Sequence, residues 1–139
     1  MVLHPYLNFD GNAEEAFRFY HAAFGGELIL RKMSDMPNQD VPESEKNRVM
    51  HASIPISENQ FLMASDIMPS MGQKLNGGNN HYICISPDSK AEADRLFNAL
   101  SEGGEIEMPM EEQFWGDYFG SFRDKFGVYW MISYELNQQ

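Results

Sequence analysis

Cysteine is almost absent from this chain of 139 residues, in which Cys84 is the only one. A single cysteine cannot form an intrachain disulfide and favours a reducing compartment, so we expect a cytoplasmic protein. Long apolar stretches are also missing, and no run of 18 apolar residues could span a membrane. The opening residues MVLHPYLNF lack a basic segment followed by an apolar core, so we expect no signal peptide.

Basic residues are scarce as well. Ten lysines and arginines stand against 21 aspartates and glutamates, which gives a net charge of −11. Such a chain repels phosphate backbones, so we expect no nucleic-acid partner. The charge favours a neutral or cationic small molecule over an anionic one. Apolar residues make up 42% and aromatic residues 13%, as in a folded globule, and we expect a single domain over residues 1–139.

What the chain does contain is one pattern written twice, 78 residues apart. Residues 10–27 read DGNAEEAFRFYHAAFGGE and residues 88–105 read DSKAEADRLFNALSEGGE. This offset aligns Phe19 with Phe97, and each copy predicts a helix that ends at a double glycine. We therefore predict two similar modules, module one at 1–66 and module two at 81–139, joined by a connector at 67–80.

Alternation and turn residues predict the other elements. Residues 3–9 alternate, with His4 and Tyr6 on the more polar side of a strand. Capping boxes are predicted at Asn12 with Glu15 and at Ser89 with Glu92. Further strands are expected at 27–32, 47–56, 60–65, 81–86, 105–110, 118–124 and 128–134. The order is βαβββ twice, so the predicted fold class is α+β, with curved sheets around a central pocket.

One polar segment interrupts this plan. Residues 33–46 contain two prolines and no clear periodicity. A loop of this length is unusual in a compact domain and often functional. We expect it to be the most mobile internal segment and a candidate lid.

Several blocks resemble one family. They are PYLNFDGNAEEA at residues 5–16, MASD at 63–66, FWG at 114–116 and DKFGVYWMI at 124–132. Together they resemble the PhnB-like branch of the vicinal oxygen chelate superfamily, the group of glyoxalases, bleomycin-resistance proteins and extradiol dioxygenases. The resemblance implies the two-module fold. The branch has carried a demethylubiquinone methyltransferase label, but no glycine-rich strand-to-helix turn is present here to hold a methyl donor.

Metal-using members of the superfamily take ligands, typically two His and two Glu, from the first and fourth strand of each half. The resemblance places His4 at the first of these positions, and the repeat carries it to Tyr82. Met63 and Met131 fall where the relatives have carboxylates, and thioethers bind hard divalent metals poorly. We therefore expect no metal and no cofactor. His81 would reach the metal position only if a bulge reversed its side of the strand.

The predicted pocket is apolar and aromatic, with a few hydrogen-bonding groups. Its candidate residues are His4, Tyr6, Met63, Ser65, Tyr82, Cys84, Trp115, Tyr129 and Met131. Trp115 could serve a ligand or a dimer interface, and Cys84 has no basic neighbour to activate it.

Two functional readings follow. We expect a homodimer, packed side by side or exchanging modules, that binds a small organic molecule. The alternative is a metal-dependent lyase, isomerase or dioxygenase of the glyoxalase type. The sequence leaves open whether the chain catalyses any reaction.

Overall fold

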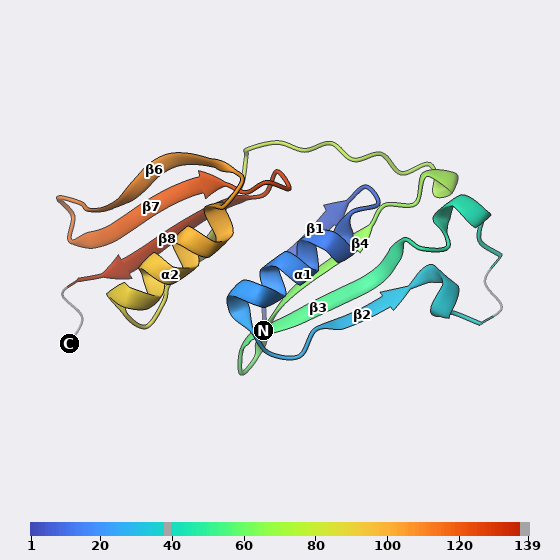
Figure 1. Cartoon of the computed structure of the whole chain (residues 1–139), viewed down its shortest axis with the longest axis horizontal. Coiled ribbons are helices and arrows are strands. Elements are labelled where there is room, and N and C mark those ends of the chain that lie inside the picture. Colours follow the sequence, from blue (N-terminus) through green and yellow to red (C-terminus); the bar gives the residue numbers. More distant parts are fainter. Residues whose placement is uncertain (38–39, 137–139) are drawn as a thin grey trace. The chain divides into compact units, whose positions relative to one another are not determined.

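The computed structural model describes residues 1–37 and 40–136 as two compact units, Met1–Asn76 and Gly77–Gln139 (Figure 1). Each unit follows the order βαβββ, which confirms the predicted α+β fold of two modules. The first contains β1 (Tyr6–Phe9), α1 (Ala13–Phe24), β2 (Ile29–Lys32), β3 (Val49–Ser57) and β4 (Gln60–Asp66). The second contains β5 (Ile83–Ile85), α2 (Lys90–Ser101), β6 (Glu105–Glu112), β7 (Asp117–Arg123) and β8 (Tyr129–Glu135).

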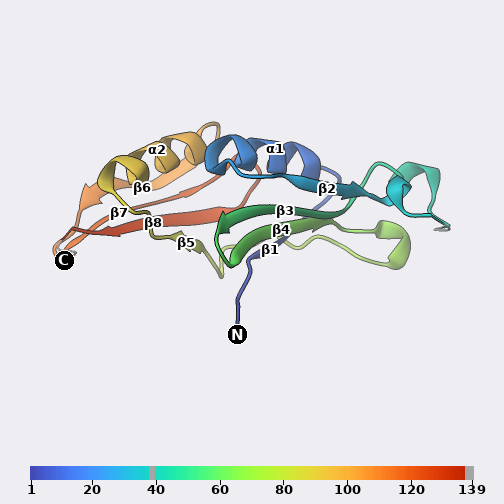
Figure 2. The same cartoon turned by 90° about the horizontal axis from the view of Figure 1, so that it is seen from below.

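The two units share one sheet topology. The strand order is β1-β4-β3-β2 in the first and β5-β8-β7-β6 in the second. In both sheets the first strand pairs in parallel with the fourth, and the other neighbours are antiparallel. Figure 2 shows each helix lying on one face of its own sheet. The opposite face of each sheet, which we call its open face, carries no helix of the same unit.

The core of unit one lies between its sheet and α1. Leu7 and Phe9 are buried, as the alternation predicts, and the ring of Phe17 meets that of Phe9 at 6.4 Å. Leu3 was expected in the same strand but is 81% exposed. The strand begins only at Tyr6, because Pro5 has no backbone N–H with which to extend the ladder.

The core of unit two shows that the two helices align at a different offset from the predicted one. Phe97 is buried against Phe122, with ring centroids 5.2 Å apart, whereas Phe19 is only half-buried. The buried faces of the two helices match at an offset of 80, so Phe17 is the counterpart of Phe97. The expected equivalence of Phe19 and Phe97 is therefore wrong. Tyr6 and Cys84 hold equivalent strand positions, and they precede Ala13 and Ala93, the first buried residues of the two helices, by seven and nine residues, so two extra residues shift the buried face of α2.

The two helices begin differently. Ser89 caps α2 as predicted, because its hydroxyl accepts from the backbone N–H of Glu92 at 3.1 Å. Asn12, by contrast, makes no side-chain cap of α1. The buried carboxylate of Asp66, at the end of β4, replaces it by accepting from Gly11 and Ala13.

The segment 33–46 contains two short 3-10 turns, Met33–Asp35 and Glu43–Glu45. Glu45 is buried and accepts hydrogen bonds from the backbone and hydroxyl of Ser70, in the 3-10 turn Pro69–Met71. The bonds from Ser70 hold the pKa of Glu45 below its usual range. Residues 38–39 of the candidate lid lie outside the described residues. None of the described helices has the length and apolarity needed to cross a membrane.

Candidate functional site

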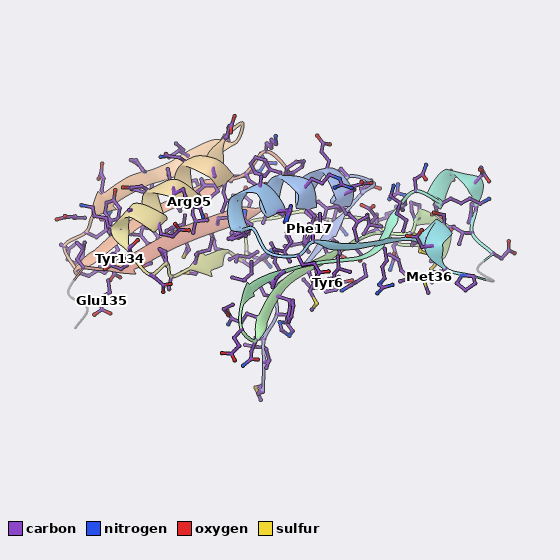
Figure 3. The ribbon with its side chains drawn as sticks, turned by 60° about the horizontal axis from the view of Figure 1, so that its bottom comes forward. Tyr6, Phe17, Met36, Arg95, Tyr134 and Glu135 are labelled. Carbon is purple, nitrogen blue, oxygen red and sulfur yellow. The ribbon has the colours of Figure 1, made fainter. Side chains whose placement is uncertain are left out.

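The open face of unit one brings together four of the predicted site residues. Tyr6 and Met63 are strand partners, and Ser65 is the partner of Asn8 on the same pair of strands. Tyr6 is 48% exposed, and Figure 3 shows it on the opposite side of the sheet from Phe17. Its ring lies 6.1 Å from that of His51.

His4 lies just before β1 and is held by backbone. Its Nδ1 accepts the N–H of Phe61 at 3.1 Å, so this nitrogen carries no proton in the bonded state. The imidazole also meets the ring of Phe61 edge-on at 5.7 Å. His4 therefore continues the β1–β4 ladder with its side chain, which leaves Nε2 to face a ligand or solvent.

The open face of unit two carries four further predicted residues. Cys84 is the strand partner of Met131, so the two side chains share a face. Tyr82 and Tyr129 meet edge to face, with ring centroids 5.4 Å apart and planes at 63°. Ile83 and Ile85 pair with Trp130 and Ile132 on the buried side, which agrees with the predicted alternation.

The same row of positions occurs on both faces. In unit one, Met63 lies between Tyr6 and Ser53, and in unit two, Met131 lies between Cys84 and Ser121. Both serines are buried. The two methionines therefore occupy equivalent positions, in the register that the sequence alignment of their strands predicts.

A carboxylate that the sequence did not point out lies against Tyr82. The phenol of Tyr82 donates to Glu107 Oε1 at 2.8 Å. This bond is the main reason that the pKa of Tyr82 is raised above its ordinary value. The β6–β7 register shifts between Ile106 and Met108, so Glu107 is the extra residue of a bulge. Bulges re-aim side chains, and no periodicity in the sequence reveals one.

Cys84 is exposed but poorly suited to nucleophilic chemistry. Desolvation on the sheet face, followed by the negative charge of Asp117, raises the pKa of the thiol. The thiolate is the nucleophilic form, and its fraction at neutral pH is therefore small.

Trp115 lies in the turn between β6 and β7. Its indole N–H donates to Asp117 at 2.9 Å, and its ring meets those of Phe114 and Phe119. Phe119 pairs with Ser133 on the open face, so Trp115 borders that face. Phe114 is 98% exposed, and its ring contacts that of Trp115 edge-on.

The residues at the metal positions do not fit a divalent ion. His4 uses Nδ1 for a backbone bond, Tyr82 is bonded to Glu107, and Met63 and Met131 supply thioethers. His81 precedes β5, is exposed and lies beside Asn80. Over residues 1–37 and 40–136, no three His, Cys, Asp or Glu side chains gather as they would around a metal.

A shallow hollow of about 420 Å³ lies elsewhere, at the start of α1. It is lined by Gly11, Asn12, Glu14, Glu15 and Arg18. Two of its charged side chains, Arg18 and Glu14, form an ion pair at 2.7 Å. None of the predicted pocket residues borders it.

The fold of the chain is that of solved glyoxalase/bleomycin-resistance/dioxygenase domains. A domain of that description from Frankia sp. EAN1pec matches 100% of this chain and 94% of its own, with a TM-score of 0.70 at 14% identity. The sequence profile of the 3-demethylubiquinone-9 3-methyltransferase family matches residues 2–133, and the chain belongs to this family.

Individual relatives agree with that assignment. Protein YjdN from Escherichia coli is 33% identical over 96% of this chain and 95% of its own length. The crystal structure of PA1353 from Pseudomonas aeruginosa is 43% identical over 97% of this chain and 98% of its own, with a TM-score of 0.85. A PhnB protein from Bacillus cereus is 24% identical over 96% and 99%, with a TM-score of 0.75. The predicted resemblance to the PhnB-like branch is confirmed.

Proposed function

We propose that the open faces of the two units bind a small organic molecule, without a complete metal site. The observation that carries this proposal is the matched row of Tyr6, Met63 and Ser53 in one unit and Cys84, Met131 and Ser121 in the other. Thioethers and aromatic rings give an adaptable apolar surface, and a few hydroxyl and imidazole groups orient what lies on it.

The family name offers a different function, methyl transfer. A methyl donor with a nucleotide part is commonly held at a glycine-rich turn between a strand and a helix. Here the turn after β1 reads DGN at residues 10–12, and the turn after β5 reads SPDS at residues 86–89. Neither has the spaced glycines of such a turn, which supports binding over methyl transfer.

The side chains at the four metal positions argue against the metal-dependent alternative. A hard divalent ion needs about three protein ligands in its first shell, and His4 is the one good donor among the four positions. The decisive measurement is metal analysis of protein purified without chelators. A stoichiometric divalent ion that is lost in the variant His4→Ala would favour the alternative.

Binding can be tested with the methionines as reporters. With 13C-labelled methionine methyl groups, a bound molecule should shift the Met63 and Met131 signals. Met71 lies 75% exposed in the turn after β4 and serves as the remote reference. A panel of neutral, cationic and anionic aromatic compounds that moves neither Met63 nor Met131 would contradict the proposal.

We also propose a homodimer in a reducing compartment. Phe114, Trp115 and Phe61 are exposed aromatic residues that an interface could bury, and the single thiol suits a cytoplasmic protein. The copies could pack side by side or exchange modules through residues 67–80. Sedimentation at micromolar concentration should give about twice the chain mass of 16.0 kDa. A clean monomer would refute the dimer.

A further inference from the structure

We propose that Tyr82, Tyr129 and Glu107 form a binding site for an organic cation, such as a substituted ammonium group. The inference rests on the proposed function, because it names the class of molecule that the open face of unit two accepts. All three residues belong to that unit, so the site needs no residue from unit one.

The two rings form an angled aromatic wall. Their centroids are 5.4 Å apart and their planes meet at 63°, so the rings do not stack flat on each other. Both side chains are half-buried, which leaves part of each ring accessible. The face of an aromatic ring attracts a cation that lies within about 6 Å of its centroid, and two rings at an angle can contact one such cation together.

Glu107 provides the opposite charge. Its Oε1 accepts from the Tyr82 phenol at 2.8 Å, which fixes a carboxylate beside the aromatic wall. Because the phenol stays protonated, its oxygen is a donor to Glu107 and can still accept from an N–H of the ligand. A cation at this position is therefore neutralised by a carboxylate and covered by aromatic rings.

Glu107 lies at a bulge in β6. Ile106 pairs with Phe122 on the buried side, and Met108 pairs with Ser121 on the open face. Glu107 is the extra residue between them. Glu105, the partner of Arg123 on the open face, precedes it by two residues, so alternation along β6 also directs Glu107 toward the open face, where it bonds to Tyr82.

The charges of the open face are mixed: an acidic pair lies at the end of β8 remote from Tyr129, and a basic residue is the neighbour of Tyr129. Asp117 and Glu135 are strand partners on the open face, and the charge of Asp117 is felt at Cys84. The basic side chain on the same face is Arg123, the partner of Tyr129. Its Nη2 is 3.4 Å from the point where a Cβ on Gly127 would lie, so the guanidinium rests against the turn before β8. The net charge of −11 adds a long-range attraction.

Choline and its neutral carbon isostere 3,3-dimethylbutan-1-ol test the proposal, because they differ in charge and not in shape. Each is titrated into the full-length protein while the Tyr82 and Tyr129 ring signals are followed by NMR. We expect choline to bind about tenfold more tightly than the alcohol, since a cation gains from both the rings and the carboxylate.

Substitutions distinguish cation binding at this site from a general attraction to the negatively charged protein. Glu107→Gln should reduce choline affinity about fivefold and leave the alcohol unchanged. Glu111→Gln, on the same strand, removes the same charge away from the rings and should leave choline binding intact. Tyr82→Phe keeps the ring but loses the bond to Glu107, so it should lose part of the affinity.

Equal affinities for choline and the alcohol would overturn the inference, as would equal losses in the Glu107 and Glu111 variants. If neutral aromatic compounds still shift Met131 in that case, the proposed binding function stands and only the cation preference is wrong. If no compound of any charge shifts Met63 or Met131, the proposed function itself fails.

Discussion

The buried carboxylate of Asp66 accepts the backbone N–H of Ala13, the first residue of α1, at 3.0 Å, and it is the end of β4 that provides this cap. The same oxygen accepts from Gly11 at 2.8 Å, and the other oxygen accepts from Val49 at 2.8 Å. One side chain therefore joins three elements of unit one, and the helix cannot be capped until β4 is in place.

Replacing Asp66 should destabilise unit one strongly. Asp66→Ala leaves the N–H groups of Ala13 and Val49 without their acceptor, and we expect a loss of about 3–5 kcal/mol in the free energy of unfolding. The measurement is urea denaturation followed by circular dichroism. Asp10→Ala is the control, because its ion pair with Arg48 is largely exposed on the aspartate side and should contribute less than about 1 kcal/mol. Similar losses in both variants would contradict this role.

Gly104 and Gly25, one from each double glycine, should respond differently to alanine. A Cβ on Gly104 would lie 2.1 Å from the carbonyl oxygen of Arg123, so Gly104→Ala must displace backbone and should lower the melting temperature severely. Gly25 has open space around it but lies at φ +73° and ψ −157°, a region that is essentially restricted to glycine, so Gly25→Ala should cost about 1–3 kcal/mol through backbone strain alone. Thermal melts of the two variants test this difference. Equal melting temperatures would show that space at Gly104 is not limiting.

The phenol of Tyr118 should lose its proton at a higher pH than an ordinary tyrosine. Its hydroxyl donates to Asp94 on α2 at 2.5 Å, which raises the pKa of Tyr118 to about 12. The unfolded value is about 10, so the folded state holds this proton more tightly. The stabilisation is complete below pH 10 and is lost as the pH rises toward 12.

Absorbance at 295 nm should show the late phenol among the six tyrosines of the chain. Tyr118→Phe should remove that step and flatten the loss of stability between about pH 10 and 12. Asp94→Asn keeps the ring and should move the step to lower pH. A Tyr118 step that does not move in this variant would show that Asp94 is not its cause.

Cys84 should react slowly with iodoacetamide despite its exposure. Desolvation and Asp117 raise the pKa of the thiol, so the pH midpoint of the alkylation rate should lie higher in the folded protein than in urea. Asp117→Asn should lower the folded midpoint by a part of that difference, because desolvation is the larger cause. An unchanged midpoint between folded and unfolded protein would argue against this environment.

His4→Ala should weaken ligand binding without changing the metal content. Loss of one hydrogen-bonding group corresponds to about a fivefold change in affinity for a compound that shifts the Met63 methyl signal. His21→Ala is the matched control, because His21 lies on α1, away from the open face, and its imidazole bonds to the carbonyl oxygen of Gly26 just after that helix. A larger effect of His21→Ala on binding would place the ligand elsewhere.

The sequence predicts the modules and the strand faces well, because both depend on local patterns. Alternation places Tyr6 and Met63, and likewise Cys84 and Met131, on open faces, and the pairing agrees. The cap of α1 could not be predicted, because its acceptor lies 53 residues along the chain from Ala13. Nor could the bond between Tyr82 and Glu107 be found, since it joins residues 25 positions apart in the chain that come from opposite edges of the sheet.

The composition of β6 bears on how copies of this chain can associate. β6 is an edge strand of its sheet, and its eight residues include Glu105, Glu107, Glu111, Glu112 and Pro109. A second copy that added its own β6 at this edge would bring four carboxylates against four others, at a position where proline provides no N–H. Such continuous sheet growth between molecules is the route to fibrils, and this edge resists it. The composition of β6 therefore disfavours a dimer formed by joining the sheets of two copies at this edge.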